Sequence, residues 1–452
     1  MSGTDGTSRQ HIGVALSGGG HRAALFALGS LLYLVDAGKG PEIATVSSIS
    51  GGSLTNGFVG LTTDLTTATP EEFRTTITPL AKALSTEGTI WSQPITYLYL
   101  GSMLAVAAAA TVADFPLDVI PALGVWIVAL VVIGWLSTKR SALANHTFDR
   151  KLYHGAKLAE LNTTVDHVLC ATDYQTAEHV YFSGRFVNSY RLGWGVPADL
   201  ALSRAVQASA ALPGAFNPVK LPIGRHRFQG TSDDAPKQML LGDGGCYDNM
   251  GTEWHLEADR RSQRPFAPTP TIHVPDEIVV VNASAGLEVT ERRSLRVPFL
   301  GEITTLVAVK DVLYDQTTAV RRRLLFLRFT APADTPPAFK GAMVQIDRSP
   351  FAMIESFAGK CDEPEKDDDP SDPKGNRARD LKERLDCATK DSWEKIADES
   401  KGVKTALSKL SAPAAARLLH HAYVLTMVNT HILLDYPLLP IPDVADFERL
   451  LR

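Results

Sequence analysis

The sequence predicts an α/β fold with a parallel sheet, because two units of strand, glycine turn and helix follow each other near its start. Residues 11–16 form an apolar, β-compatible run that ends at three glycines, and residues 23–34 have the apolar spacing of a buried helix. Residues 43–49 form a second β-rich run, and a tight glycine turn separates it from another helical segment that starts at Leu54. Consecutive units of this kind are typical of parallel α/β sheets.

Later segments extend this α/β domain to about residue 330. Strands are expected at 166–171, 179–182 and 277–281, and helices at 200–211 and 303–323. Residues 361–376 hold seven acidic residues and three prolines, which predicts an exposed linker. We therefore expect one domain over residues 8–330 and an extension over 331–452 that is helical from 378 to 434.

Composition excludes some function classes. A net charge of −5 gives no general electrostatic support for a nucleic-acid partner. The four cysteines have no CxxC pair and no metal-ligand spacing, so we expect a reduced compartment, no disulfide, no metal and no cofactor. The N-terminus lacks a secretory signal pattern, which also favours a cytosolic body.

Two long apolar segments interrupt the predicted domain. Residues 95–113 and 119–136 contain no charged side chain, and only DFPLD separates them. Each is just long enough to cross a bilayer as a helix. The acidic connection and the basic Lys139 and Arg140 that follow favour a hairpin over 94–137 whose two ends stay in the cytosol. Two core helices of a large soluble domain are the alternative.

Ser50 is the candidate nucleophile, because it lies in SISGGS, where a strand meets a helix. Small flanking residues allow the sharp elbow that lifts a serine hydroxyl clear of the backbone. Ser48 takes the place of the first glycine of the usual G-x-S-x-G pattern. On spacing alone, a serine in a glycine turn is also compatible with a purely structural role.

The glycine loop Gly18, Gly19 and Gly20 precedes a helix, so its amides can point at a developing oxyanion, and Arg22 can add positive charge. The same loop matches a dinucleotide-binding fingerprint. That alternative requires an acidic residue at the end of the second strand, where Ser50 and its neighbours stand.

Asp243 lies between glycines in LGDGG, after a short apolar run. Such a pattern is usually a turn. An aspartate within hydrogen-bonding reach of a serine can nevertheless take its proton without a histidine.

The order of SGGGHRA, SISGGS, ASAALPGAFNPV and DGGCYDN resembles the patatin-like phospholipase family, and the S-G-G-G-x-R-A form is also similar to the related cytosolic phospholipases. CATDYQTAEHVYF resembles the family's strand pair. The resemblance implies a three-layer α/β/α fold, a dyad of Ser50 and Asp243, an oxyanion hole from the glycine loop with Arg22 nearby, and hydrolysis of fatty acyl esters of lipids. The sequence departs from the family pattern at Ser48 and at Ala177, which stands where a glycine is expected.

Two other readings stay open at this point. A Ser-Asp-His triad would use His255 or His273, and a membrane-bound scaffold or nucleotide-binding module would have an inactive elbow. We expect a membrane protein with its catalytic domain on the cytosolic side and a membrane phospholipid or another acyl lipid as substrate. Two basic runs can attract anionic headgroups but are also typical of a solvated face: Arg292, Arg293 and Arg296, and residues 321–323. The sequence leaves the oligomeric state open.

Overall fold

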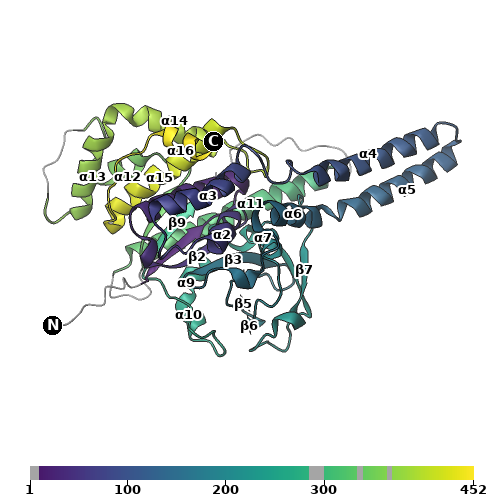
Figure 1. Ribbon diagram of the computed structural model, residues 1–452, viewed down its shortest axis with the longest axis horizontal. Helices are drawn as coiled ribbons and strands as arrows, with labels where there is room; N and C mark the ends of the chain where they lie inside the picture. Colours follow the sequence, from purple (N-terminus) through teal and green to yellow (C-terminus); the bar gives the residue numbers. More distant parts are fainter. Residues whose placement is uncertain (1–9, 285–299, 333–338, 364–368) are drawn as a thin grey trace.

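The computed structural model describes residues 10–284, 300–332, 339–363 and 369–452 (Figure 1). Within them, ten strands form one mixed sheet whose main path has the order β10-β9-β1-β2-β3-β4-β5-β6, and β8 pairs with both β3 and β7. The strands are β1 (Ile12–Leu16), β2 (Ile43–Ile49), β3 (Asp166–Asp173), β4 (Glu178–Phe182), β5 (Val187–Ser189), β6 (Gly193–Gly195), β7 (Val219–Pro222), β8 (Gln238–Asp243), β9 (Glu277–Asn282) and β10 (Lys340–Gln345).

The predicted parallel arrangement is confirmed for five of the ten strands. Strands β10, β9, β1, β2 and β3 are parallel, and β1 and β2 are completely buried. The pairs from β3 to β6, and those of β8 with β3 and β7, are antiparallel. The prediction of a parallel sheet therefore holds only in part, because short turns such as the one between β3 and β4 can join only antiparallel neighbours.

Helices cover the sheet, and the main ones near the site are α1 (Gly20–Asp36), α2 (Gly51–Thr62), α3 (Pro70–Leu84), α7 (Leu202–Ser209), α11 (Leu300–Thr330) and α15 (Ala412–Leu434). Helix α1 packs against α15, which comes from the far end of the chain. A Cβ added to Gly29 of α1 would lie 2.4 Å from the carbonyl oxygen of Leu419, so this close approach requires glycine. Because β10 and α15 both lie beyond residue 330, the C-terminal extension completes the body that contains β1 and α1.

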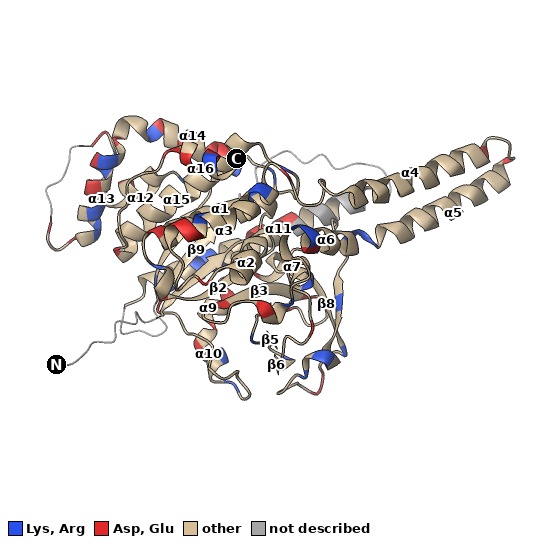
Figure 2. Cartoon of the chain, in the orientation of Figure 1, with Lys and Arg blue, Asp and Glu red and all other residues tan. Residues whose placement is uncertain are grey.

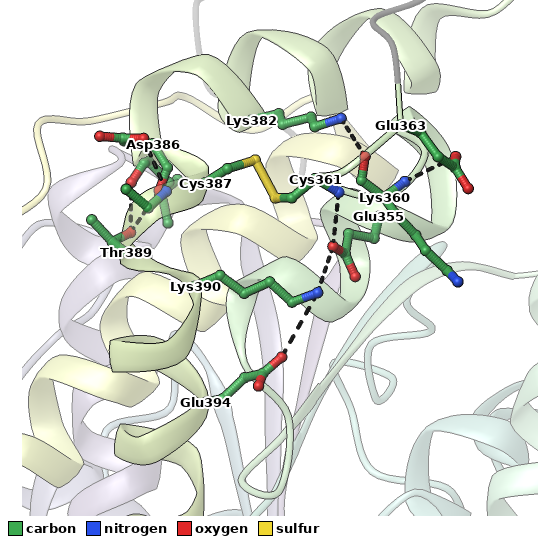
Figure 3. Close-up of a disulfide and its surroundings, with 12 residues drawn as sticks. Glu355, Lys360, Cys361, Glu363, Lys382, Asp386, Cys387, Thr389, Lys390 and Glu394 are labelled. Atoms are coloured by element: carbon green, nitrogen blue, oxygen red, sulfur yellow. Dashed lines mark hydrogen bonds and ion pairs between the residues drawn. A yellow bond between two sulfur atoms is a disulfide. The ribbon is translucent and has the colours of Figure 1, made fainter.

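The C-terminal helices form a layer beside α15, as the yellow and yellow-green ribbons of Figure 1 show. They are α12 (Pro350–Ala358), α13 (Pro373–Leu385), α14 (Lys390–Lys401) and α16 (Val444–Leu450). A disulfide between Cys361 and Cys387 joins the segments that flank α13, and Lys390 contacts Glu355 nearby at 2.7 Å (Figure 3). The expectation of four reduced cysteines is therefore wrong for this pair. Their separation of 26 residues gave no signal in the sequence, and the folding of the helices brings them together.

The two apolar segments form helices α4 (Pro94–Asp114) and α5 (Val119–Ser137), which pack side by side and project from the body (Figure 1). Both are long and apolar enough to cross a membrane, and only 11% and 6% of their most apolar windows are buried. Figure 2 shows them almost free of charged residues, with acidic groups at the tip and basic groups at the root. The alternative of two buried core helices is wrong, since a core helix would be covered by protein.

Shorter helices complete the described structure. They are α6 (Arg140–Phe148), α8 (Gly245–Asp248), α9 (Glu253–Leu256) and α10 (Ala258–Ser262), with the single turns η1 (Gly40–Glu42), η2 (Asp149–Tyr153), η3 (Leu158–Glu160), η4 (Ile223–His226) and η5 (Cys387–Thr389). Of the two basic runs, Arg292, Arg293 and Arg296 lie outside the described residues, and Arg321 on α11 is paired with Glu253.

Candidate active site

Ser50 lies on a sharp elbow between β2 and α2. Its backbone has φ 48° and ψ −113°, a region that residues other than glycine rarely adopt. A Cβ added to the next residue, Gly51, would lie 2.1 Å from the carbonyl oxygen of Gly20, so only glycine allows this approach of the two loops. The elbow therefore brings the Ser50 side chain next to the glycine loop.

Ser48 fits where a glycine is more usual, because its hydroxyl group is fully hydrogen-bonded. The Ser48 hydroxyl donates to the carbonyl oxygen of Val168 at 3.1 Å. It accepts from the Ser53 hydroxyl at 3.0 Å and from the Asn56 amide at 2.9 Å. Buried hydroxyl groups are tolerated when they are paired in this way. The departure at Ser48 thus leaves the elbow intact.

Strand register brings the ends of β2 and β8 together. On β3, Cys170 pairs with Ile49 of β2, and the next residue, Ala171, pairs with Asp243 of β8. Because β4 occupies the other edge of β3 at both positions, β2 and β8 share one edge and approach each other end to end. Ser50 follows Ile49 directly, so the register places the elbow beside Asp243.

Asp243 is almost completely buried, with 1% of its surface exposed. One of its carboxylate oxygens, Oδ1, accepts a hydrogen bond from the Gly245 amide at 2.8 Å. Tyr314 of α11 packs at the same place, because a Cβ added to Gly245 would lie 2.6 Å from Tyr314 Cε1 and 3.0 Å from Asp243 Oδ1. Burial and the neighbouring Asp243 carboxylate both raise the pKa of Tyr314, which keeps its phenol neutral.

Ser209, which the sequence did not single out, supports both halves of the site. Its hydroxyl oxygen accepts a hydrogen bond from the Ser50 amide at 3.0 Å and its hydroxyl proton goes to the Cys170 carbonyl at 2.6 Å. Its own carbonyl oxygen accepts from the Gly244 amide at 3.1 Å, next to Asp243. The residue lies in the segment ASAALPGAFNPV, so the motif was visible in the sequence but this role was not.

The glycine loop presents two amides to the cavity. The Gly18 amide donates to the Asn249 carbonyl at 3.0 Å, and the His21 amide donates to the Ala406 carbonyl at 3.0 Å. Gly19 and Gly20 have positive φ values of 137° and 60°. Among the described residues no protein acceptor takes either of their N–H groups. The start of α1 thus offers these two donors, and its helix dipole adds positive potential.

Arg22 lines the same cavity, and its guanidinium is bound to backbone carbonyls. It donates to the carbonyl oxygens of Lys401 at 3.1 Å and Val403 at 2.8 Å. Burial lowers its pKa to about 10, so the group remains charged at neutral pH. Arg22 therefore holds the segment after α14 in place. This segment continues to Ala406, whose carbonyl oxygen accepts a hydrogen bond from the His21 amide at the end of the glycine loop. The sequence gave no indication that residues 401–407 contribute to the site.

All six predicted site residues line one cavity of about 600 Å³: Ser50, Asp243, Gly18, Gly19, Gly20 and Arg22. Most of the remaining wall is apolar. It comes from α4 and the segment before it, from α6 and from the segment after α7, and the residues include Ile90, Trp91, Tyr99, Leu100, Leu143, Leu212 and Phe216. Four residues of α11 also line it: Asp311, Tyr314, Asp315 and Thr318. The shape and lining suit an apolar chain attached to a polar head.

The two histidines of the triad hypothesis lie elsewhere. His255 is completely buried, and its Nε2 atom lies 2.8 Å from the Ser47 hydroxyl and 3.1 Å from the Val14 carbonyl. His273 contacts the Asp166 carboxylate at 3.2 Å. Neither residue is among those that line the cavity. In the described part of the chain, no three His, Cys, Asp or Glu side chains cluster in a way that would hold a metal ion.

The chain is similar to known proteins in sequence and in structure. The family model for patatin-like phospholipases matches residues 14–253, more than half of the chain. The structure is similar to human GIVD cytosolic phospholipase A2, with 12% identity and a TM-score of 0.46 over 98% of this chain and 60% of that chain. VipD from Legionella pneumophila matches with 12% identity and a TM-score of 0.27 over 95% of this chain and 88% of that one.

These similarities differ in weight. This chain spans about 60% of the length of the human enzyme, and neither structural match is close enough to carry an argument. No curated protein matches the sequence. The family model includes the glycine loop, the elbow, β3, β4 and the segment around Asp243. The chain belongs to the patatin-like phospholipase family.

Proposed function

We propose that this protein hydrolyses acyl esters of lipids through a dyad of Ser50 and Asp243. The observation that carries the proposal is that a serine in a strained elbow, a buried aspartate and the free amides of a glycine loop line one largely apolar cavity. The serine hydroxyl can act as the nucleophile, the carboxylate can accept its proton, and the amide N–H groups can stabilise an oxyanion. Membership of the family supports an acyl lipid as the substrate.

In the proposed reaction, the Ser50 hydroxyl oxygen attacks the ester carbonyl carbon while its proton passes to the Asp243 carboxylate. The amides of Gly19 and Gly20 stabilise the oxyanion that forms. The tetrahedral intermediate then collapses, the ester bond breaks, and the alcohol leaves with the proton from Asp243. Water attacks the acyl-enzyme while its proton passes to Asp243, the bond between the acyl carbon and the Ser50 oxygen breaks, and that oxygen takes the proton back from Asp243 as the fatty acid is released. The complete cycle thus returns both residues to their starting protonation states.

The site also supports a membrane substrate. Thr96, Tyr99 and Leu100 of α4 line the cavity, so the apolar hairpin begins at the cavity wall. In this proposal α4 and α5 cross the bilayer as a helical hairpin, because helices satisfy their backbone hydrogen bonds internally. The catalytic body then lies at the cytosolic leaflet, where an acyl chain has only a short way to move to reach Ser50.

Labelling with a serine-reactive fluorophosphonate tests the nucleophile. The parent protein should be modified at Ser50, whereas Ser50→Ala should not react and Asp243→Asn should react slowly. Turnover should fall by about 10²–10⁴-fold in either variant, and the double variant should be about as inactive as a single one, since the two groups act as a unit. Ser262→Ala and Asp259→Asn on α10 serve as matched controls.

Robust turnover by Asp243→Asn at neutral pH would overturn the dyad. Products released from a mixed lipid extract by the parent, and absent with Ser50→Ala, would identify the lipid class and the bond that is cleaved.

A further inference from the structure

His21 directly follows the glycine loop, at the position x of the S-G-G-G-x-R-A form. It is the second residue of α1, and only 1% of its surface is exposed. Both ring nitrogens have hydrogen-bond partners from other segments. Nδ1 lies 2.9 Å from the Ser408 carbonyl oxygen, and Nε2 lies 2.9 Å from the Thr89 hydroxyl oxygen. The ring therefore joins the start of α1 to two segments that are distant from it in the sequence.

These partners determine the form of the His21 ring. Burial lowers its pKa to about 4, so the ring is neutral at physiological pH and carries a single N–H. A carbonyl oxygen can only accept a hydrogen bond, so this N–H is at Nδ1 and donates to Ser408. Nε2 is then the acceptor, and the Thr89 hydroxyl donates to it. Both bonds thus persist together in the neutral ring.

The 402–410 segment, which follows α14, lies directly against the glycine loop. The His21 amide donates to the Ala406 carbonyl at 3.0 Å, and a Cβ added to Gly20 would lie 2.5 Å from the same oxygen. Residues 405–407 also line the cavity. The bond to Ala406 occupies the His21 amide and leaves the two preceding amides for an oxyanion. Because His21 follows Gly20 directly, a shift of this segment would turn the backbone at Gly20 as well.

The second partner, Thr89, belongs to the segment that leads into α4. Thr89 is completely buried, and the two residues that follow it line the cavity. The Leu410 amide donates to the Ser85 carbonyl at 3.0 Å, so this segment and the 402–410 segment are also bonded to each other. His21 thus connects the glycine loop with two walls of the cavity.

We infer that His21 is a positioning residue, which aligns the Gly20 amide with the oxyanion by holding the 402–410 segment and the segment before α4 against the glycine loop. This inference rests on the proposed hydrolysis. Loss of the two ring bonds would release both segments from α1. The Gly20 amide would then lose its alignment, while the dyad would stay in place because the register of β2, β3 and β8 positions it.

The variant His21→Phe tests this role, because it keeps a buried ring of similar size and removes both ring hydrogen bonds. With detergent-solubilised full-length protein and a short, soluble ester, kcat should fall by about 10- to 100-fold with little change in KM, since an oxyanion donor acts in the transition state. His21→Asn should restore most of kcat, because its side-chain amide can take the place of Nδ1 and donate to Ser408. Thr89→Val keeps the side-chain shape, removes only the bond to Nε2 and should lower kcat by a smaller factor.

His226→Phe is the matched control. His226 is 3% exposed, and its Nδ1 atom lies 2.9 Å from the Val196 carbonyl oxygen. It is not among the residues that line the cavity. This variant should also lose stability, as a lower Tm, but should keep the kcat of the parent.

Two further measurements separate positioning from general stability. The Ser50 oxygen adds to the carbonyl carbon of a trifluoromethyl ketone, and the resulting hemiketal carries an oxyanion. Its inhibition constant should rise in His21→Phe in parallel with the fall in kcat, because the same amides bind both oxyanions. Amide hydrogen exchange, which needs no turnover, should become faster across residues 402–410 in His21→Phe and remain unchanged there in His226→Phe.

An unchanged kcat in His21→Phe would overturn the positioning role, as would equal losses of kcat in His21→Phe and His226→Phe. A fall in kcat without faster exchange across residues 402–410 would overturn it as well. Absence of ester turnover in the parent, with exchange of this segment still faster in His21→Phe, would instead contradict the hydrolase and confirm that His21 holds the segment.

Discussion

The Ser50 amide donates a hydrogen bond to the hydroxyl oxygen of Ser209 at 3.0 Å. This bond joins the strained elbow to the end of α7. The same hydroxyl donates to the Cys170 carbonyl, at the position where β3 changes its partner from β2 to β8. Ser209 thus helps to position both the elbow that carries the candidate nucleophile, Ser50, and the segment that carries its candidate base, Asp243.

Ser209→Ala should therefore weaken the site as well as the fold. The buried Ser50 amide and Cys170 carbonyl would each lose a partner, which costs about 1–3 kcal/mol in the free energy of unfolding. We expect a fall of roughly tenfold in kcat with little change in KM, since the elbow moves while the cavity is retained. Steady-state kinetics and urea titration measure the two effects.

Ser203→Ala is the matched control for this change. Ser203 is on the same helix and equally buried, but its hydroxyl has no partner in the described part of the chain. It should keep parent activity. Equal losses in the two variants would show that Ser209 has no special connection to the elbow.

Ala177→Gly should stabilise the protein. Ala177 has φ 57° in the turn between β3 and β4, a left-handed conformation that costs a residue with a Cβ about 1–2 kcal/mol. The greater freedom of glycine in the unfolded chain offsets about 0.4–1 kcal/mol of that gain. We expect a net gain of about 0.5–1 kcal/mol, visible as a slightly higher Tm. Ala201→Gly, at φ −64°, should lower the Tm.

Stability should fall as the pH drops below about 6.5. Burial lowers the pKa of five histidines from 6.5 to about 4: His21, His167, His179, His255 and His421. Between these values the unfolded chain binds protons that the folded protein excludes, so acid favours unfolding. Each histidine contributes a slope of up to about 1.4 kcal/mol per pH unit in this window.

Thermal unfolding of the detergent-solubilised protein from pH 7 to pH 5 measures this slope. His421→Gln removes one of these groups in the α15 layer, away from the cavity, and should reduce the slope by one proton. An unchanged slope would mean that His421 is protonated in the folded protein as readily as in the unfolded chain.

Shortening the hairpin should separate membrane attachment from chemistry. Because Thr96, Tyr99 and Leu100 line the cavity, a deletion of the whole hairpin would also remove part of the site. Replacing residues 103–132 by a short Gly-Ser linker keeps this wall. The variant should become soluble, keep turnover of a short ester and lose most turnover of bilayer lipid. Release of the full-length protein from membranes by alkaline carbonate or high salt alone would show that the hairpin does not span.

The sequence alone determined the local elements of this protein. Apolar runs, glycine turns and helical spacing located β1, β2, α1, α2 and the hairpin to within a few residues, because these patterns reflect contacts between near neighbours in the chain. The order of the motifs around Ser50 and Asp243 indicated the family before any distance was known. The length and composition of α4 and α5 fixed their capacity to span a bilayer.

Only the tertiary structure decided which distant segments meet. The partner change on β3, the hydrogen bonds of Ser209, the turn that Arg22 holds after α14, and the pairing of Cys361 with Cys387 depend on strand register and on helix packing. Such contacts join residues 26 to about 380 positions apart, and no local pattern encodes them. The same holds for α11: its composition showed a helix, but only its place over the cavity revealed that four of its residues line the wall.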